Sequence, residues 1–234
     1  MGGQVVSEAA DIQARDAPTR RWAWLLATAA PVAGLVGSLA ITGASVMSAL
    51  AYTGTEGEAY SPLNHWVSEL GELDVSSLAA VFNVGLMIGG ACLAIFMLGL
   101  AASRSGRLRF LYGPIGAMSG IAGIFVGVAP MNYIGAHTIA AQTFFNLGWI
   151  AVGLASIDFL RHPDVRFPRW LSALGGLTVM AFVSFLILYY QPDTTTGHPP
   201  FRLVVTLEWL VLAGIVAWVF VASWRWLRLR DRPT

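Results

Sequence analysis

Long apolar runs alternate with shorter polar connections along this chain. Six runs reach about 20 residues or more, the length that an α-helix needs to cross a bilayer. They cover residues 22–52, 77–102, 110–130, 137–160, 170–190 and 203–224. The pattern predicts an all-α fold, a polytopic membrane bundle of six transmembrane helices. Residues 1–21 are polar without apolar periodicity, so we expect a disordered tail there.

The connection between the first two runs carries a helix signal of its own. Ser61 suits an N-cap, Pro62 the first helical position and Gly71 a left-handed C-terminal stop, so residues 62–70 are expected to form a short helix. At α-helical spacing its apolar face holds Leu63, Trp66, Val67 and Leu70, and its polar face Asn64, His65, Ser68 and Glu69. This outward helix would lie along the membrane interface, with the polar face either solvated or lining a pocket.

Composition agrees with a membrane protein. Hydrophobic residues make up 56% of the chain and charged residues 12%, outside the range of a soluble domain. The single cysteine, Cys92, lies in an apolar run, so neither a disulfide framework nor a thiolate metal site is expected. The spacings of nucleotide-binding loops, zinc proteases and serine hydrolases do not occur. A nucleic-acid partner is not expected, and the sequence indicates no particular cofactor.

Basic residues, all of them arginine, gather in alternate connections. They occupy the first tail, the second and fourth connections and the C-terminus, whereas the other connections hold only Arg202. By the positive-inside rule, both termini face the cytoplasm and the first, third and fifth connections face outward. Residues 22–226 then form the membrane domain, and residues 1–21 and 227–234 are cytoplasmic tails. The first outward connection is acidic throughout.

Ionisable and amide side chains inside the runs are few, and in hydrocarbon they normally face the bundle interior or a wet cavity. Counting along the helices places Asn83, His137 and Glu208 within about two turns of the outward surface, on the side of Ser68 and Glu69. The candidate ligand-binding set at this end is His65, Ser68, Glu69, Asn83, His137, Gln142, Arg202 and Glu208.

Several of these residues have structural alternatives. His137 could equally well cap a helix or lie in the headgroup region. Hydrogen bonds to a neighbouring helix explain Gln142 and Asn146 more simply than contact with a ligand does. Glu208 at its depth must be paired, hydrated or protonated. The combination of His65, Glu69 and His137 has no recognised metal-ligand spacing, so no metal site is predicted.

Other polar and small residues have structural interpretations. Asp158 is expected to pair with Arg161 at a helix end. His162 and His198 are expected to be solvated in loops. Glycines recur at three and four residues in the third run, which predicts a close helix contact; they are Gly113, Gly116, Gly120, Gly123 and Gly127.

Several short motifs resemble known families. Ser68-Glu69-Leu70-Gly71, Phe82-Asn83, and His137 with Phe144 or Phe145 behind it resemble an uncharacterised bacterial six-span membrane family, domain of unknown function 998. The Glu208-Trp209 pair adds a likeness to the eukaryotic Frag/DRAM/Sfk family. The first resemblance implies six helices in a bacterial plasma membrane, and the second an association with membrane lipid. Neither implies catalytic residues.

Three functions remain open at this stage. The first is lipid handling, with a headgroup under the short helix and its phosphate at Arg202 or His137. The second is an intramembrane lipid-modifying enzyme with Glu69 or Glu208 as general acid or base and His137 as partner. The third is a proton-coupled carrier that uses Glu208 as the titrating group. Membrane lipid is the one partner that the sequence indicates.

Overall fold

The computed structural model describes the backbone of residues 2–192 and 199–229, and the side chains of residues 21–192 and 199–229. It contains α1 (Gly2–Leu50), η1 (Val67–Gly71), α2 (Ala79–Ser103), α3 (Arg109–Val128), η2 (Met131–Tyr133), α4 (Ile134–Arg161), α5 (Arg169–Tyr189) and α6 (Leu203–Arg228). Six of these helices are long and apolar enough to cross a membrane, and in α1 this part is Arg21–Leu50. The all-α, six-helix expectation is confirmed.

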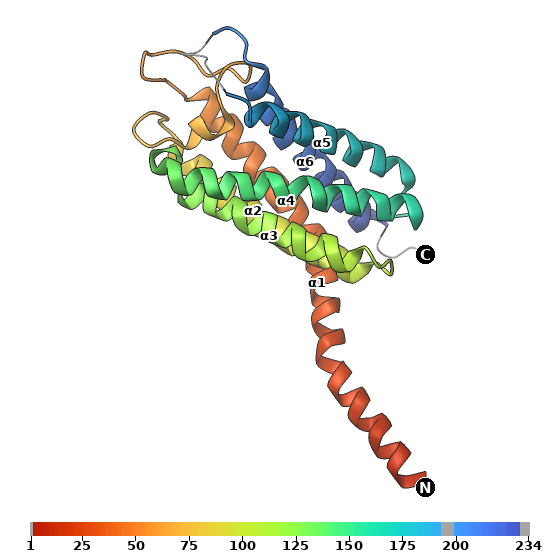
Figure 1. Cartoon of the computed structure of the whole chain (residues 1–234). Coiled ribbons are helices and arrows are strands. Elements are labelled where there is room, and N and C mark those ends of the chain that lie inside the picture. The colour runs from red at the N-terminus through yellow and green to blue at the C-terminus, as the bar shows by residue number, and fades with distance from the viewer. Residues whose placement is uncertain (1, 193–198, 230–234) are drawn as a thin grey trace.

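The ends of the helices differ little from the apolar runs. Apart from the early start of α1, the larger shifts are at the end of α6, which extends to Arg228, and at the start of α4, which begins at Ile134, about one turn before His137, because η2 leads directly into it. α1 is drawn as a continuous helix from Gly2, and its first part projects beyond the bundle (Figure 1). Disorder of the tail in solution stays a prediction. His198 and the last arginines lie outside the described residues.

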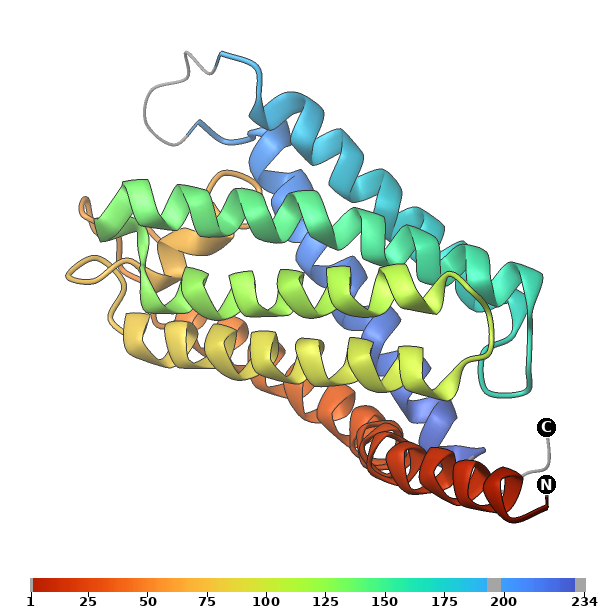
Figure 2. The same ribbon diagram turned by 60° about the horizontal axis from the view of Figure 1, so that its bottom comes forward.

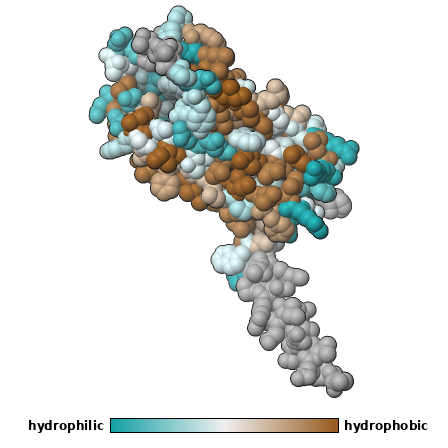
Figure 3. All heavy atoms as spheres, viewed as in Figure 1, coloured by the Kyte–Doolittle hydropathy of each residue, from teal (hydrophilic) through white to brown (hydrophobic). Residues whose placement is uncertain are grey.

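The six helices form a closed ring. Each helix packs against its neighbour in the chain, and α1 also packs against α6. The connections that carry η1 and η2 lie together at one end, named here the η1 end (Figure 2). α6 finishes at the opposite end, which carries most of the arginines. Hydrophobic residues form the middle of the molecular surface and hydrophilic residues gather at the two ends (Figure 3).

The glycine stripe of α3 packs against α2, as predicted. A Cβ atom added at Gly90 would lie 2.5 Å from the Gly120 carbonyl oxygen, and one at Gly120 would lie 2.6 Å from the Gly90 carbonyl oxygen. The two backbones approach so closely that neither position has room for a side chain. This contact fixes the helices that carry Asn83 and, through α4, His137.

The expected pairing of Asp158 with Arg161 is wrong. Asp158 is fully buried, and its Oδ2 atom accepts a hydrogen bond of 2.8 Å from Nε of Arg104 at the end of α2. Arg161 is exposed. Asp158 faces the bundle interior, where an arginine from another helix reaches it and a residue one turn farther along its own helix does not.

Candidate functional site

The short helix at the η1 end is a 3-10 helix, Val67–Gly71, preceded by a turn. Residues 62–66 are not helical and residues 67–71 have three residues per turn, so the predicted α-helical faces are wrong. Leu63 is 48% exposed, whereas His65 and Glu69 are 2% and 6% exposed. The Oε1 atom of Glu69 accepts a hydrogen bond of 3.1 Å from the Trp66 backbone N–H, which satisfies part of the buried carboxylate. Glu69 therefore helps to define the start of η1.

Glu208 ties α6 to the first residue of η1. Its Oε2 atom accepts a hydrogen bond of 2.7 Å from the Val67 backbone N–H, and both residues are buried. The carboxylates of Glu208 and Glu69 are near enough to interact electrostatically. Two acidic side chains, from η1 and from α6, thus meet at one end of the bundle.

Asn83 holds the other end of η1. Its Nδ2 atom donates a hydrogen bond of 2.9 Å to the Gly71 carbonyl oxygen. A Cβ atom at Gly71 would lie 2.2 Å from Oδ1 of Asn83. Gly71 does not adopt the predicted left-handed conformation, since the positive φ angles among the described residues are at Gly57 and Asp74. This glycine is needed for a close approach to α2.

His65 lies in an aromatic cluster, with its ring centroid 5.5 Å from that of Tyr52 and 5.1 Å from that of Tyr60. Nε1 of Trp209 donates a 2.9 Å hydrogen bond to the Tyr60 hydroxyl, which donates a 2.8 Å hydrogen bond to the Trp66 carbonyl oxygen. Burial, followed by the charge of Glu208, raises the pKa of the Tyr60 hydroxyl. The cluster anchors the η1 connection to α6.

A cavity lies beneath η1. Its volume is about 70 Å³, and its polar lining residues are Ser68 of η1, His137 of α4 and Glu208 of α6. Nδ1 of His137 is 2.9 Å from the Ala129 carbonyl oxygen. A carbonyl only accepts, so Nδ1 carries the proton, and in the neutral ring Nε2 is an acceptor. The rest of the lining is apolar and includes Phe82 and Phe144.

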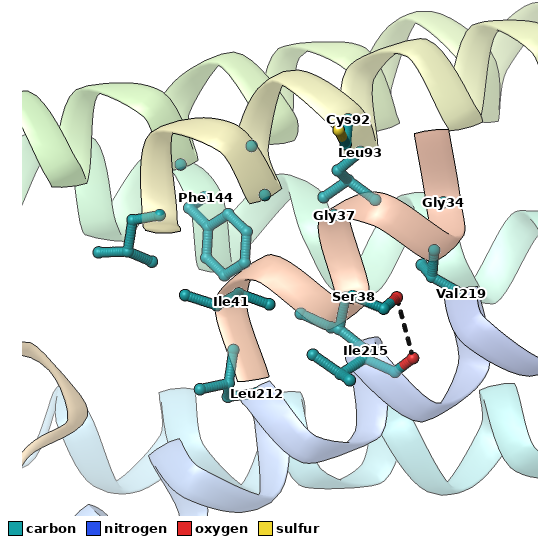
Figure 4. A pocket seen from close by; sticks show the side chains of 15 residues that line it. Gly34, Gly37, Ser38, Ile41, Cys92, Leu93, Phe144, Leu212, Ile215 and Val219 are labelled. Carbon is teal, nitrogen blue, oxygen red and sulfur yellow. Dashed lines mark hydrogen bonds between the residues drawn. The ribbon is translucent and has the colours of Figure 1, made fainter. Parts of the chain in front are cut away.

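A second cavity adjoins the first and extends deeper into the bundle. Its volume is about 70 Å³, and it lies mainly between α1, α2 and α6. The two cavities share the lining residues Leu86, Gly123, Phe144 and Leu212. Figure 4 shows Phe144 and Leu212 at one end of the second cavity and Val219 at the other. Together the cavities form an amphipathic space with polar groups near η1 and apolar walls below.

Side chains on α1 and α2 that the sequence analysis did not select line the deeper cavity. Gly37 of α1 lies in close contact with Cys92 of α2, Gly34 lies against Phe96 and Val219, and Ser38 directs its hydroxyl to the Val216 carbonyl oxygen at 3.5 Å (Figure 4). In the sequence, the three-residue spacing of Gly34 and Gly37 could have indicated a helix face of small residues that allows close packing.

The remaining candidates lie outside the lining of both cavities. Gln142 bonds the Tyr189 side chain, and Asn146 donates to the Tyr190 hydroxyl at 2.9 Å, so both join α4 to α5. Arg202 donates its backbone N–H to the Leu63 carbonyl oxygen at 2.7 Å and places its guanidinium carbon 5.3 Å from the Trp66 ring centroid. The structure thus brings three of the eight candidates, Ser68, His137 and Glu208, around one cavity.

Within the part of the chain that the structure describes, no group of three or more histidine, cysteine, aspartate or glutamate side chains is placed to hold a metal ion.

Comparison with known proteins gives one match. A family model described as "Protein of unknown function (DUF998)" matches residues 38–225, which include α2 to α5, the C-terminal part of α1 and most of α6. No curated protein and no solved structure matches the chain. The likeness to the Frag/DRAM/Sfk family stays an expectation.

Proposed function

The chain belongs to the DUF998 family of membrane proteins of unknown function, and we propose that it binds a membrane lipid in the two adjoining cavities. The observation that carries this proposal is the amphipathic shape of the combined space. A polar group near Ser68, His137 and Glu208 and an apolar chain in the deeper part would match its lining. A lipid has this division between head and tail.

The deeper cavity favours a hydrocarbon chain. Its lining is almost wholly apolar, and its one hydroxyl, that of Ser38, is directed to a backbone carbonyl oxygen. Each methylene group moved from water into such a space contributes about 0.8 kcal/mol. A lipid already in the bilayer gains less, so specificity for the bound lipid rests on the polar end.

The polar end favours a head that donates hydrogen bonds. Glu208 and the Nε2 atom of neutral His137 are acceptors, and Ser68 supplies a hydroxyl. The cavity lining contains no arginine, and Arg202 packs on Trp66 instead. A hydroxyl or amine group therefore fits beside Glu208 better than the phosphate that we expected at Arg202 or His137.

The enzyme alternative uses the same cavity, because His137 and Glu208 both line it. A general acid and base pair would have to act on the bound head. Turnover of labelled lipid that is lost in His137→Ala would favour this alternative over simple binding. The carrier alternative has less support, since the apolar deeper cavity offers Glu208 no polar path toward the opposite end.

Lipid recovered with the purified protein tests the binding proposal. We expect native mass spectrometry to detect a retained lipid, with recovery reduced in Glu208→Gln and in Leu212→Phe, which adds volume at a residue that lines both cavities. Leu210→Phe is the matched control, because Leu210 is 52% exposed on the same helix. Equal lipid recovery from the wild type and all three variants would contradict the proposal.

A further inference from the structure

A second polar hollow lies at the opposite end of the bundle. It holds about 950 Å³ of open space between the α2–α3 connection and the α4–α5 connection. Its lining residues are almost all polar or charged: Ser103, Arg104, Ser105, Arg109, His162, Pro163, Asp164 and Arg166. The cavities beneath η1 share none of them.

Arg104 builds the wall of this hollow. Its Nε atom donates to Asp158 and its Nη1 atom donates to Asp164, each at 2.8 Å, while Nη2 donates to the His162 carbonyl oxygen. The guanidinium carbon lies 5.6 Å from the Phe159 ring centroid and 5.5 Å from that of Phe167. All three guanidinium nitrogens of this buried arginine donate hydrogen bonds within the protein. Arg104 therefore shapes the hollow and has no nitrogen left without a partner.

Arg109 and Arg166 differ from Arg104. The Nε atom of each is buried and lacks a hydrogen-bond partner. Each side chain is held in place by another nitrogen, since Nη1 of Arg109 donates to the Arg104 carbonyl oxygen at 2.6 Å and Nη2 of Arg166 donates to Asp164 at 3.1 Å. Because these hydrogen bonds use one terminal nitrogen of each guanidinium, the other terminal nitrogen, Nη2 of Arg109 and Nη1 of Arg166, can donate to the acceptor oxygens of a ligand.

The charges favour an anion. Three arginines face the hollow against Asp158 and Asp164, which leaves one positive charge when His162 is neutral. Both carboxylates are already bonded, Asp158 to Arg104 and His162 and Asp164 to Arg104 and Arg166. Arg107 and Arg161, both exposed, add positive charge in the same two connections.

From this geometry we propose that the hollow binds a phosphate group through Arg109 and Arg166. Guanidinium forks match phosphate oxygens, and basic pockets at the ends of membrane helices hold lipid headgroups. The arginine count predicts that this end faces the cytoplasm, where anionic lipid headgroups and soluble phosphates are both present. The site is independent of the lipid cavity beneath η1.

Three probes applied to the full chain in a phosphate-free nonionic detergent test the proposal. They are inorganic phosphate, dioctanoyl phosphatidic acid and dioctanoylglycerol, which lacks phosphate, and tryptophan fluorescence or thermal shift reports their binding. We expect saturable binding of at least one phosphate probe that the arginine substitutions described below weaken, whereas any response to dioctanoylglycerol, which can enter the cavity beneath η1, should not change in those variants. Tighter binding of phosphatidic acid identifies a lipid headgroup, and equal or tighter binding of inorganic phosphate identifies a soluble ligand.

Substitutions assign the binding to the two arginines. Arg109→Gln and Arg166→Gln should each weaken it by about tenfold or more, as expected for the loss of one charge-assisted hydrogen bond. Arg107→Gln, at an exposed position outside the hollow, should change it less than about twofold. Arg166→Lys is the control that keeps the positive charge. A size-exclusion profile like that of the wild type shows that each variant is folded. Binding that is unchanged in both glutamine variants, equally weakened in Arg107→Gln, or absent for both phosphate probes overturns the proposal.

Discussion

At the scale of single residues, Asn83 shows how a polar side chain in a membrane helix is satisfied without a ligand. Its amide bonds the Gly71 carbonyl oxygen at 2.9 Å and closes η1 onto α2. We expect Asn83→Ala to lower the free energy of unfolding by about 1–3 kcal/mol, because the buried carbonyl loses its partner.

Gly71→Ala should be destabilising for a related reason, since its Cβ atom would lie 2.2 Å from the Asn83 amide oxygen. Thermal unfolding in detergent measures both variants. Gly135→Ala is the control, because a Cβ atom there would meet nothing within 4 Å. A Gly71→Ala protein as stable as the Gly135→Ala protein would show that η1 is not held in this way.

The contacts of Asp164, including that with Arg104, predict that the protein loses stability at low pH. Burial alone would raise the pKa of Asp164, but hydrogen bonds from Phe167 and Arg166 and the charges of Arg166 and Arg104 hold it below its usual value. Because the folded-state pKa is the lower one, this contribution is present above the unfolded-state pKa of about 3.9 and is lost as the pH falls through the folded value.

Unfolding temperatures measured between neutral pH and pH 3 test this sign. The wild type should lose stability below about pH 4, and Asp164→Asn should lose less over the same interval because it has no proton to bind. Parallel curves for the two proteins would mean that other carboxylates set the acid limit.

The sequence predicts single residues only where depth along a helix decides their position. Ser68, His137 and Glu208 line one cavity because each lies near the same end of its element. His65 and Glu69 were placed on the wrong face because their environment depends on a 3-10 turn and on aromatic rings from distant segments. The partner of Asp158 was missed for the same reason, since Arg104 comes from another helix.

At the scale of elements, the α2–α3 contact depends on two glycines that face each other. Gly120→Ala should destabilise the protein by about 1–3 kcal/mol, since its Cβ would lie 2.6 Å from the Gly90 carbonyl oxygen and 2.7 Å from the Ala94 nitrogen. Gly176→Ala in α5 is the matched control, because its Cβ meets nothing within 4 Å and alanine favours a helix.

Unfolding in detergent compares these two alanine variants directly. Equal stability would contradict the close contact.

The positions of the helices could be predicted from the sequence because a bilayer sets a minimum length for an apolar helix. The type of η1 was not readable, because five residues carry too few hydrophobic positions to distinguish a 3-10 period from an α-helical one.

At the scale of the whole molecule, the arginine distribution predicts orientation. In a Cys92→Ser background, a cysteine placed at exposed Thr55 should react with a membrane-impermeant maleimide on intact cells. A cysteine placed at exposed Arg107 should react only after permeabilisation. The opposite labelling pattern would reverse the orientation and place the cavity beneath η1 on the cytoplasmic side.

The contacts of α6 with η1 and with α1 have a consequence for biogenesis. The hydrogen bond from Val67 to Glu208 joins residues 141 positions apart, so the ribosome completes five membrane helices before it makes the acceptor. α6 therefore completes both the ring of helices and the lining of the two adjoining cavities. A chain that stops before Leu203 leaves the α1 wall of the deeper cavity facing the bilayer. Stabilisation by bound lipid would thus report that synthesis and insertion are complete.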